Sequence, residues 1–331
     1  MMVDCVVAFR QAFKLAGKQY GKTLRIALLI GALGLGCLGV WAKAANAPAF
    51  IDFPRTISYG ALFTWGGGSD PYRHRFYGPA QGRVIIPASR CLGLAASYDL
   101  VNNMSELEKL PPDVIKELTI DRIETSDDKP IQLKSVGHLT GLVALSVKDS
   151  SIDDQGVGYL KSLTHLKKLS LWYCGLHGDT IHDLVGLKEL CELDLSLNRL
   201  SPEAYKAIAK MPQLKKLQLS DGSVNDAALA EISKLSNVED LNIGGSSAIS
   251  TAGLQYLHNF KKLSNLNVSR CKLSVDQLVT LKGLPLRALT FSGRNFDRAA
   301  MQKLHNAFPG VILIDADPVK AHDKFLFSPL H

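Results

Sequence analysis

The sequence predicts an α/β solenoid, with a curved parallel sheet on its concave face and short helices on its convex face, preceded by one transmembrane helix. Three observations predict this fold class. A leucine recurs seven times between residues 145 and 289, at spacings of 23 to 25 residues. An alternating apolar pattern surrounds each of these leucines, and a run of seventeen uncharged residues lies near the N-terminus. Regular self-similarity at such a period is the signature of stacked repeats.

The basic character of the chain is concentrated at its N-terminus. The net charge of +7 over 331 residues consists of +5 within residues 1–43 and only +2 in the rest of the chain. Nucleic-acid binding requires a clustered basic face that neutralises several phosphates. We therefore expect no nucleic-acid partner.

Residues 25–43, with the sequence RIALLIGALGLGCLGVWAK, have the length of a short bilayer span. Because five Lys and Arg residues, the last of them Arg25, precede the uncharged run of this segment, we expect residues 1–24 to be a basic cytoplasmic leader and residues 25–43 a signal anchor. The rest of the chain would then lie on the periplasmic or extracellular side as part of a single-pass membrane protein. Cleavage of the segment as a signal peptide, which would release a secreted protein, is the alternative.

Residues 44–82 combine Gly, Pro and aromatic residues without a sustained period. This composition predicts a linker without regular elements, and its aromatic content indicates that it docks on another part of the protein. Val84 and Ile86, followed by Leu92 and Leu94, predict a short strand pair at the start of a repeat domain over residues 83–314. Residues 315–331 form a C-terminal tail.

Each repeat reads apolar-x-x-apolar-x-x-Leu-x-apolar, as in LTHLKKLSL and LKELCELDL. The alternation around the recurring leucine predicts a half-buried strand. The frame leucines are Leu145, Leu169, Leu193, Leu217, Leu241, Leu266 and Leu289. A helix N-cap residue then follows an apolar residue in most units. These predicted caps are Asp153, Ser201, Asn225, Ser250, Ser274 and Asp297, and Asp179 is the expected cap of the unit between the first two.

This pattern resembles the leucine-rich repeat family over about residues 106–314. The units are similar to the ribonuclease-inhibitor-like variety, which has true helices on the convex side. The resemblance implies a solenoid whose units bury their apolar faces only against their neighbours. Together with residues 25–43, it leads us to expect a membrane-anchored or exported, bacterial member of the family.

One position in each unit is expected to point inward at the turn that follows the strand. Small or amide-bearing side chains fill it, and they suit a site that must satisfy the backbone of the turn. The residues in this turn column are Ser150, Cys174, Asn198, Gly222, Ser246, Cys271 and, as an exception, Arg294. We interpret Cys174 as a buried packing thiol rather than a nucleophile or metal ligand.

The sequence contains no Gly-rich phosphate loop, nucleophile elbow or HExxH motif. We therefore expect a non-enzymatic module without a cofactor or a metal site. HGDTIHD at residues 177–183 has no established zinc-ligand spacing. The first alternative is an enzyme or envelope factor whose active segment lies in residues 48–105, with the repeats as a platform for the substrate. An F-box-type ubiquitin-ligase adaptor is the second alternative, and the membrane segment disfavours it.

The outward strand positions are polar and mixed in sign, which favours a protein partner bound on the concave face. The candidate partner-binding residues are Lys168, Ser170, Trp172, Tyr173, Glu192, Asp194, Lys216, Gln218, Asp240 and Asn242. Trp172 and Tyr173 are exceptional because other units have smaller residues at the first of these positions. They are expected either to anchor the partner or to be covered by residues 48–82.

Overall fold

The structure is a computed structural model that describes residues 50–65, 74–86, 91–123 and 129–317. The predicted leader, the predicted membrane span over residues 25–43 and most of the C-terminal tail lie outside these residues. No helix within the described residues combines the length and the hydropathy needed to cross a bilayer. The chain divides into two compact units, Met1–Pro48 and Ala49–His331, and all described residues belong to the second.

Twelve described strands form one sheet in the order β14-β13-β12-β11-β10-β9-β8-β7-β6-β5-β2-β3. They are β2 (Gly60–Trp65), β3 (Arg75–Pro79), β5 (Cys91–Ala96), β6 (Glu117–Asp121), β7 (Ala144–Lys148), β8 (Lys168–Trp172), β9 (Glu192–Asp194), β10 (Lys216–Gln218), β11 (Asp240–Asn242), β12 (Asn265–Asn267), β13 (Ala288–Phe291) and β14 (Ile312–Asp315). All neighbours from β5 to β14 are parallel. The described part of the repeat region therefore has the predicted parallel sheet.

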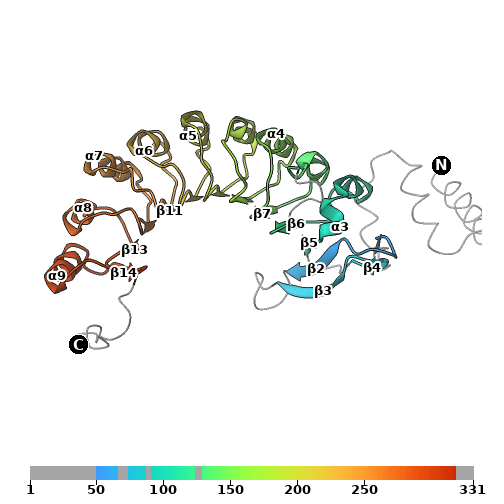
Figure 1. Cartoon of the computed structure of the whole chain (residues 1–331), viewed down its shortest axis with the longest axis horizontal. Helices are drawn as coiled ribbons and strands as arrows, with labels where there is room; N and C mark the ends of the chain where they lie inside the picture. Colours follow the sequence, from blue (N-terminus) through green and yellow to red (C-terminus); the bar gives the residue numbers. More distant parts are fainter. Residues whose placement is uncertain (1–49, 66–73, 87–90, 124–128, 318–331) are drawn as a thin grey trace, which may run out of the picture. The chain divides into compact units, whose positions relative to one another are not determined.

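Helices connect successive parallel strands and lie on the outer side of the stack, whereas the strands line its inner side (Figure 1). The α-helices are α3 (Tyr98–Val101), α4 (Asp154–Gly158), α5 (Pro202–Ile208), α6 (Asp226–Ile232), α7 (Thr251–Leu254), α8 (Val275–Val279) and α9 (Arg298–Ala307). The 3₁₀ helices are η2 (Met104–Lys109), η3 (Leu133–His138), η4 (Tyr159–Ser162), η5 (Ile181–Gly186) and η6 (Gln255–Asn259). Each unit is therefore a strand, a turn and a short helix.

The strand register follows the frame leucines. Each of the first six frame leucines pairs with the corresponding leucine of the next strand, from Leu145 opposite Leu169 to Leu266 opposite Leu289. All seven are buried, and Leu193 in the middle of the stack is only 1% exposed. Because a shift of one residue would turn every leucine to the solvent, burial fixes the register. The predicted register is confirmed.

The six N-cap residues predicted from the units that form α-helices are confirmed. In each case the side-chain oxygen accepts a hydrogen bond from a first-turn backbone N–H. Ser274 and Gln277 also form a reciprocal capping box. An uncapped helix start would leave these N–H groups without partners, so the caps define where each helix begins.

The prediction that Asp179 caps a helix is wrong. The helix of its unit is the 3₁₀ helix η5, and its N-cap is Thr180, without a capping bond from the side chain. The backbone of this turn is held from the preceding unit instead, because the Asp154 carboxylate accepts hydrogen bonds from the N–H groups of His177, Gly178 and Asp179 at 2.6 to 3.2 Å.

The prediction of an unstructured linker needs correction for the described part of residues 44–82. Strand β1 (Phe50–Asp52) pairs with β4 (Arg83–Ile85), and β2 pairs with both β3 and β5. A bulge between Leu62 and Phe63 interrupts the regular register, which explains why no sustained period of two is visible. Residues 50–65 and 74–86 therefore cover the first parallel strand as an N-terminal cap of the solenoid.

The aromatic residues of this cap include two that dock inward, as expected. Phe53 and Tyr59 are buried and form an edge-to-face pair with ring centroids 6.1 Å apart. The predicted pair of strands within residues 83–96 exists as β4 and β5, but the two strands belong to different sheets. Each of them pairs with a strand from the segment that was predicted to be a linker.

Candidate partner-binding surface

One row of the concave face alternates in charge from strand to strand. Lys168, Glu192, Lys216 and Asp240 occupy the same register position on β8, β9, β10 and β11. We call these four residues the charge ladder. Lys168 Nζ lies 3.0 Å from Glu192 Oε1, and Lys216 Nζ lies 3.8 Å from Asp240 Oδ2. The four side chains are 34 to 54% exposed, so the pairs add little to stability but present alternating charge to the solvent.

The next row of predicted binding residues forms hydrogen bonds within the sheet and its turns. This row consists of Ser170, Asp194, Gln218 and Asn242. The Ser170 hydroxyl donates to Asp194 Oδ2 at 3.0 Å, and Gln218 Nε2 donates to Asp240 Oδ1 at 3.1 Å. Asp194 Oδ1 accepts from the Ser196 N–H, just as Asn242 Oδ1 accepts from the Gly244 N–H. Asp194 and Asn242 therefore close the turn after their strands, and only part of each side chain remains for a partner.

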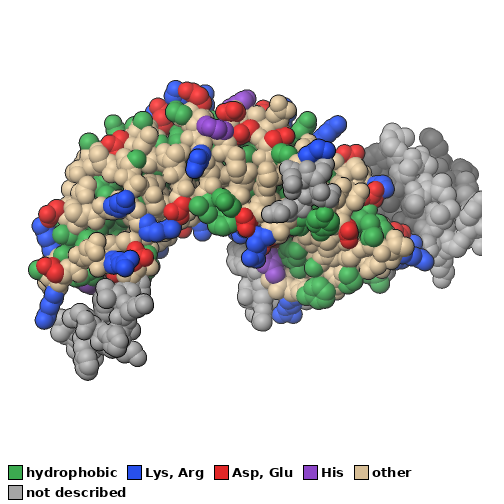
Figure 2. Space-filling model, in the orientation of Figure 1, with side chains coloured by type: hydrophobic (Ala, Val, Ile, Leu, Met, Phe, Trp, Pro, Cys, Tyr) green, Lys and Arg blue, Asp and Glu red, His purple; other side chains and the backbone are tan. Residues whose placement is uncertain are grey.

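A shallow depression lies on the concave face across β6 to β10, and short side chains form its floor. The depression has a volume of about 340 Å³. Its floor includes Thr119, Ser146 and Ser170, which lie opposite one another on β6, β7 and β8. The Ser146 Oγ is buried and has no hydrogen-bond partner among the described residues. Figure 2 shows basic, acidic and hydrophobic side chains interspersed along the inner side of the stack.

Trp172 and Tyr173 stand at the carboxyl end of β8. Trp172 is half-buried, whereas Tyr173 is 55% exposed, and the two rings meet edge to face with centroids 5.9 Å apart. Tyr173 has a φ of 52°. This value lies in the left-handed region, which non-glycine residues adopt only rarely.

The left-handed conformation occurs at one equivalent position in each of several successive units. The non-glycine residues in this left-handed column are Arg122, Asp149, Tyr173, Leu197, Asp221 and Arg270, with φ between 48° and 59°. Gly245 occupies the same position with a φ of 79°. A non-glycine residue here costs about 1 to 2 kcal/mol. The left-handed conformation of this column was not predicted, although the Asp and Gly residues at corresponding positions were a signal for it.

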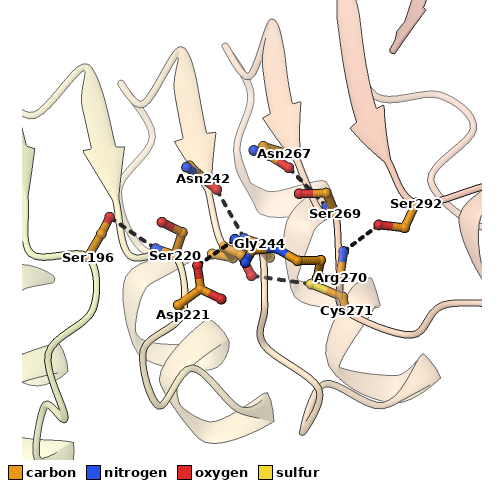
Figure 3. Close-up of polar contacts among 11 residues, drawn as sticks. Ser196, Ser220, Asp221, Asn242, Gly244, Asn267, Ser269, Arg270, Cys271 and Ser292 are labelled. Atoms are coloured by element: carbon orange, nitrogen blue, oxygen red, sulfur yellow. Dashed lines mark hydrogen bonds and ion pairs between the residues drawn. The ribbon is translucent and has the colours of Figure 1, made fainter. Parts of the chain in front are cut away.

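A polar network follows this column through the later units (Figure 3). Arg270 forms an ion pair with Asp221, two units away, across Gly245. A Cβ atom at Gly245 would overlap with the Asp221 carboxylate, so this glycine gives the two charged side chains room to meet. Ser220, Ser269 and Arg270 also donate backbone N–H groups to side-chain oxygens of the network.

Asn198 organises the turn column as expected from its amide. Its Oδ1 accepts from the N–H groups of Cys174 and Leu176 at 3.1 and 3.0 Å. Its Nδ2 donates to the carbonyl oxygens of Leu171 and Leu195 at 2.7 and 3.0 Å, and also to that of Ser196. One buried side chain thus satisfies backbone groups of two adjacent units. The exception, Arg294, is exposed, and its neighbour Gly293 donates instead to Asp315 Oδ1.

The two cysteines of the turn column are buried thiols. Cys174 Sγ contacts the carbonyl oxygen of Val147 at 3.3 Å, and Cys271 Sγ contacts that of Ile243 at 3.2 Å. Burial raises the pKa of Cys174 to about 12 and that of Cys271 to about 11. A thiol of this kind is protonated at neutral pH and is a poor nucleophile. Cys174 is thus buried in the turn column, as predicted.

The decisive observations are the leucine register, the capped helix after each strand and the turn column. The chain is a leucine-rich repeat protein. No protein-family model matches this chain. It is 30% identical over 191 residues to the PPP1R7 homologue of Arabidopsis thaliana, a protein phosphatase 1 regulatory inhibitor subunit that is itself a leucine-rich repeat protein. That alignment covers 56% of this chain and 53% of the relative.

A second relative is a probable inactive serine/threonine-protein kinase of Dictyostelium discoideum. It is 31% identical over 107 residues, which are 32% of this leucine-rich repeat protein and 5% of the relative. The chain thus spans about half of one relative's length and a small part of the other's.

Two solved structures are similar to the leucine-rich repeat protein. An internalin from Listeria monocytogenes is 19% identical, with a TM-score of 0.44, over 64% of this chain and 70% of that chain. TLR13, in a complex with ssRNA13, is 17% identical, with a TM-score of 0.45, over 67% of this chain and 36% of that chain. Both TM-scores are below 0.5, so the family assignment depends on the register, caps and turns described above.

Proposed function

We propose that this leucine-rich repeat protein is a membrane-anchored, non-enzymatic module that binds a protein partner. The partner contacts the concave face and the Trp172–Tyr173 pair. The observation that carries the proposal is the exposure of Tyr173 on a left-handed backbone beside Trp172. Aromatic side chains bury a large area at a small cost in rotamer entropy, and they are enriched among residues that dominate binding energy.

The charge ladder supports a protein partner over a nucleic acid. A phosphate backbone presents charges of one sign, and it is recognised by a cluster of cations. Alternating Lys and acidic residues suit a surface that carries both signs. The Arabidopsis relative is, by its name, a regulatory subunit of another protein, which agrees with this class of partner.

The membrane part of the proposal rests on the sequence of residues 25–43. We infer a retained span with a cytoplasmic N-terminus and the repeats on the outer side, with secretion after cleavage as the alternative. Protease added to the outer side of intact inner-membrane preparations should digest the repeats and spare residues 1–24. Protection of the repeats from the protease would overturn this topology.

The binding role is tested by crosslinking the full chain in intact membranes and identifying the captured protein by mass spectrometry. We expect Trp172→Ala and Tyr173→Ala to reduce capture at least tenfold without lowering the melting temperature. Tyr159→Ala is the matched control, because Tyr159 is 44% exposed and lies on η4 on the convex side. It should leave capture unchanged.

The test also addresses the second interpretation of the aromatic pair. If Trp172→Ala lowers the melting temperature and leaves capture intact, the pair docks residues of this chain and the proposed binding role is wrong. Equal losses of capture for Tyr159→Ala and Tyr173→Ala would likewise contradict a role for the concave face.

A further inference from the structure

We propose that the element recognised by the concave face is an α-helix of the partner, lying across the strands with its own alternating charges opposite the charge ladder. This inference rests on the proposed function, since it specifies which partner element fits the same surface. Three features carry it: the distance between outward side chains along β8, the spacing of the charge ladder and the order of its signs.

The distance along β8 is set by three side-chain positions of this strand. Lys168, Ser170 and Trp172 point to the same face of β8, because they are two residues apart. The two outer residues are about 13 Å apart along the strand, at about 3.3 Å per residue. The Ser170 position between them belongs to the hydroxyl-bearing floor. A helix with its side chains is about 10 to 12 Å wide, so it fits between Lys168 and Trp172.

The spacing of the charge ladder favours a helix over an extended segment. Adjacent strands are about 4.8 Å apart, so the ladder has one charge about every 4.8 Å. On one face of a helix, side chains recur with each turn, about every 5.4 Å. On one face of an extended chain, side chains recur with every second residue, about every 6.7 Å. Over the three steps from Lys168 to Asp240, the positions on the helix and on the ladder come to differ by only about 2 Å. Long Lys and Glu side chains can reach over this difference. An extended segment drifts by about 6 Å and loses the register.

The signs define the charge pattern of the partner helix. Opposite Lys168, Glu192, Lys216 and Asp240, the complementary helix carries acidic, basic, acidic and basic residues at positions i, i+4, i+7 and i+11. Such complementarity contributes mainly to specificity, because a helix with another order places like charges together. The partner helix is therefore mixed in charge and close to neutral on this face.

The experiment measures binding of labelled synthetic helices to the purified full chain by fluorescence anisotropy. Two Ala-rich peptides of identical composition carry four charges at i, i+4, i+7 and i+11. The alternating peptide has the order Glu-Lys-Glu-Lys, and the blocked peptide has the order Glu-Glu-Lys-Lys. The alternating order matches all four ladder residues in one of the two helix directions, whereas the blocked order matches only two of them in either direction. We expect the alternating peptide to bind about tenfold more tightly.

A matched variant reverses the expected preference. Glu192→Lys combined with Lys216→Glu changes the ladder to two basic followed by two acidic residues without changing the net charge. This variant should prefer the blocked peptide. Lys168→Glu combined with Asp240→Lys gives the opposite block and should show the same preference, so the reversal does not depend on one variant folding. A third probe, with the alternating charges on every second residue and Pro between them, stays extended and should bind at least tenfold more weakly than the alternating helix.

The outcomes separate this inference from the proposed function. Equal binding of the two helical peptides to the native chain, no binding of either, or tighter binding of the extended probe would overturn the helix proposal. If any of these occurs while Trp172→Ala still abolishes capture in membranes, the binding role stands and only the helix is wrong. Reversal of the preference in both double variants supports the helix.

Discussion

Replacement of Asn198 by Ala tests whether one buried amide connects two units of the solenoid. Asn198 is 1% exposed, and its Oδ1 is the acceptor for the backbone N–H groups of Cys174 and Leu176. Ala would leave two buried N–H groups without this acceptor, each at a cost of roughly 2 kcal/mol. We expect a loss of about 4 kcal/mol in the free energy of unfolding, a large part of the stability of a domain.

Urea unfolding of the full chain, followed by far-UV circular dichroism, measures this loss. The matched control is Asn237→Ala, because the Asn237 amide also donates to a backbone carbonyl oxygen, that of Pro212, but at an exposed site. Water replaces that bond, so the control should lose less than about 1 kcal/mol. Losses of similar size in the two variants would refute the assignment of Asn198 as the link between units.

Three further predictions concern the register, the thiols and the left-handed column. Leu193→Asp places an unpaired carboxylate in the core and should abolish the cooperative melting transition, whereas Lys216→Ala should cost less than about 0.5 kcal/mol; equal melting of the two would contradict the register. At pH 8.5, iodoacetamide should alkylate the exposed Cys91 in the native chain but Cys174 only after unfolding, because burial raises the pKa of Cys174 to about 12, and peptide mass spectrometry would reveal any native labelling of Cys174. Tyr173→Gly relieves a left-handed backbone and should raise the free energy of unfolding by about 1 kcal/mol while abolishing partner capture; a loss of stability in urea would show that the Tyr173 ring supports the fold.

Much of the repeat fold could be predicted because its physics is local and periodic. Leu193 and its equivalents appear in the sequence at the spacing at which they stack in the structure. The caps were predictable for a similar reason, since Ser201 and its equivalents act on N–H groups only two or three residues away. Interactions within one unit leave a signal in the sequence of that unit.

Interactions between units were harder to predict. Asp179 looked like a cap, but its turn is held by Asp154, which lies 25 residues earlier in the chain. The strands of residues 50–65 were missed because their partners, β4 and β5, follow later in the chain and pair antiparallel, and because a bulge interrupts the pairing of β2 with β3. The Arg270–Asp221 ion pair spans two units and depends on a glycine between them. None of these contacts follows from the spacing within a single repeat.

In the candidate site, too, some side chains are explained by the fold and others are not, and this difference helps to identify the residues that could bind a partner. Sequence position alone grouped Asp194 and Asn242 with Trp172 and Tyr173, yet the first two close the turns after their own strands. Their polar side chains are explained by the fold. Tyr173 is not explained in this way, because Gly or Asp satisfies a left-handed position at lower cost, as Gly245 does. An exposed aromatic ring at a position where a non-glycine residue costs stability supports the proposed binding role, so its loss is the most direct test of that function.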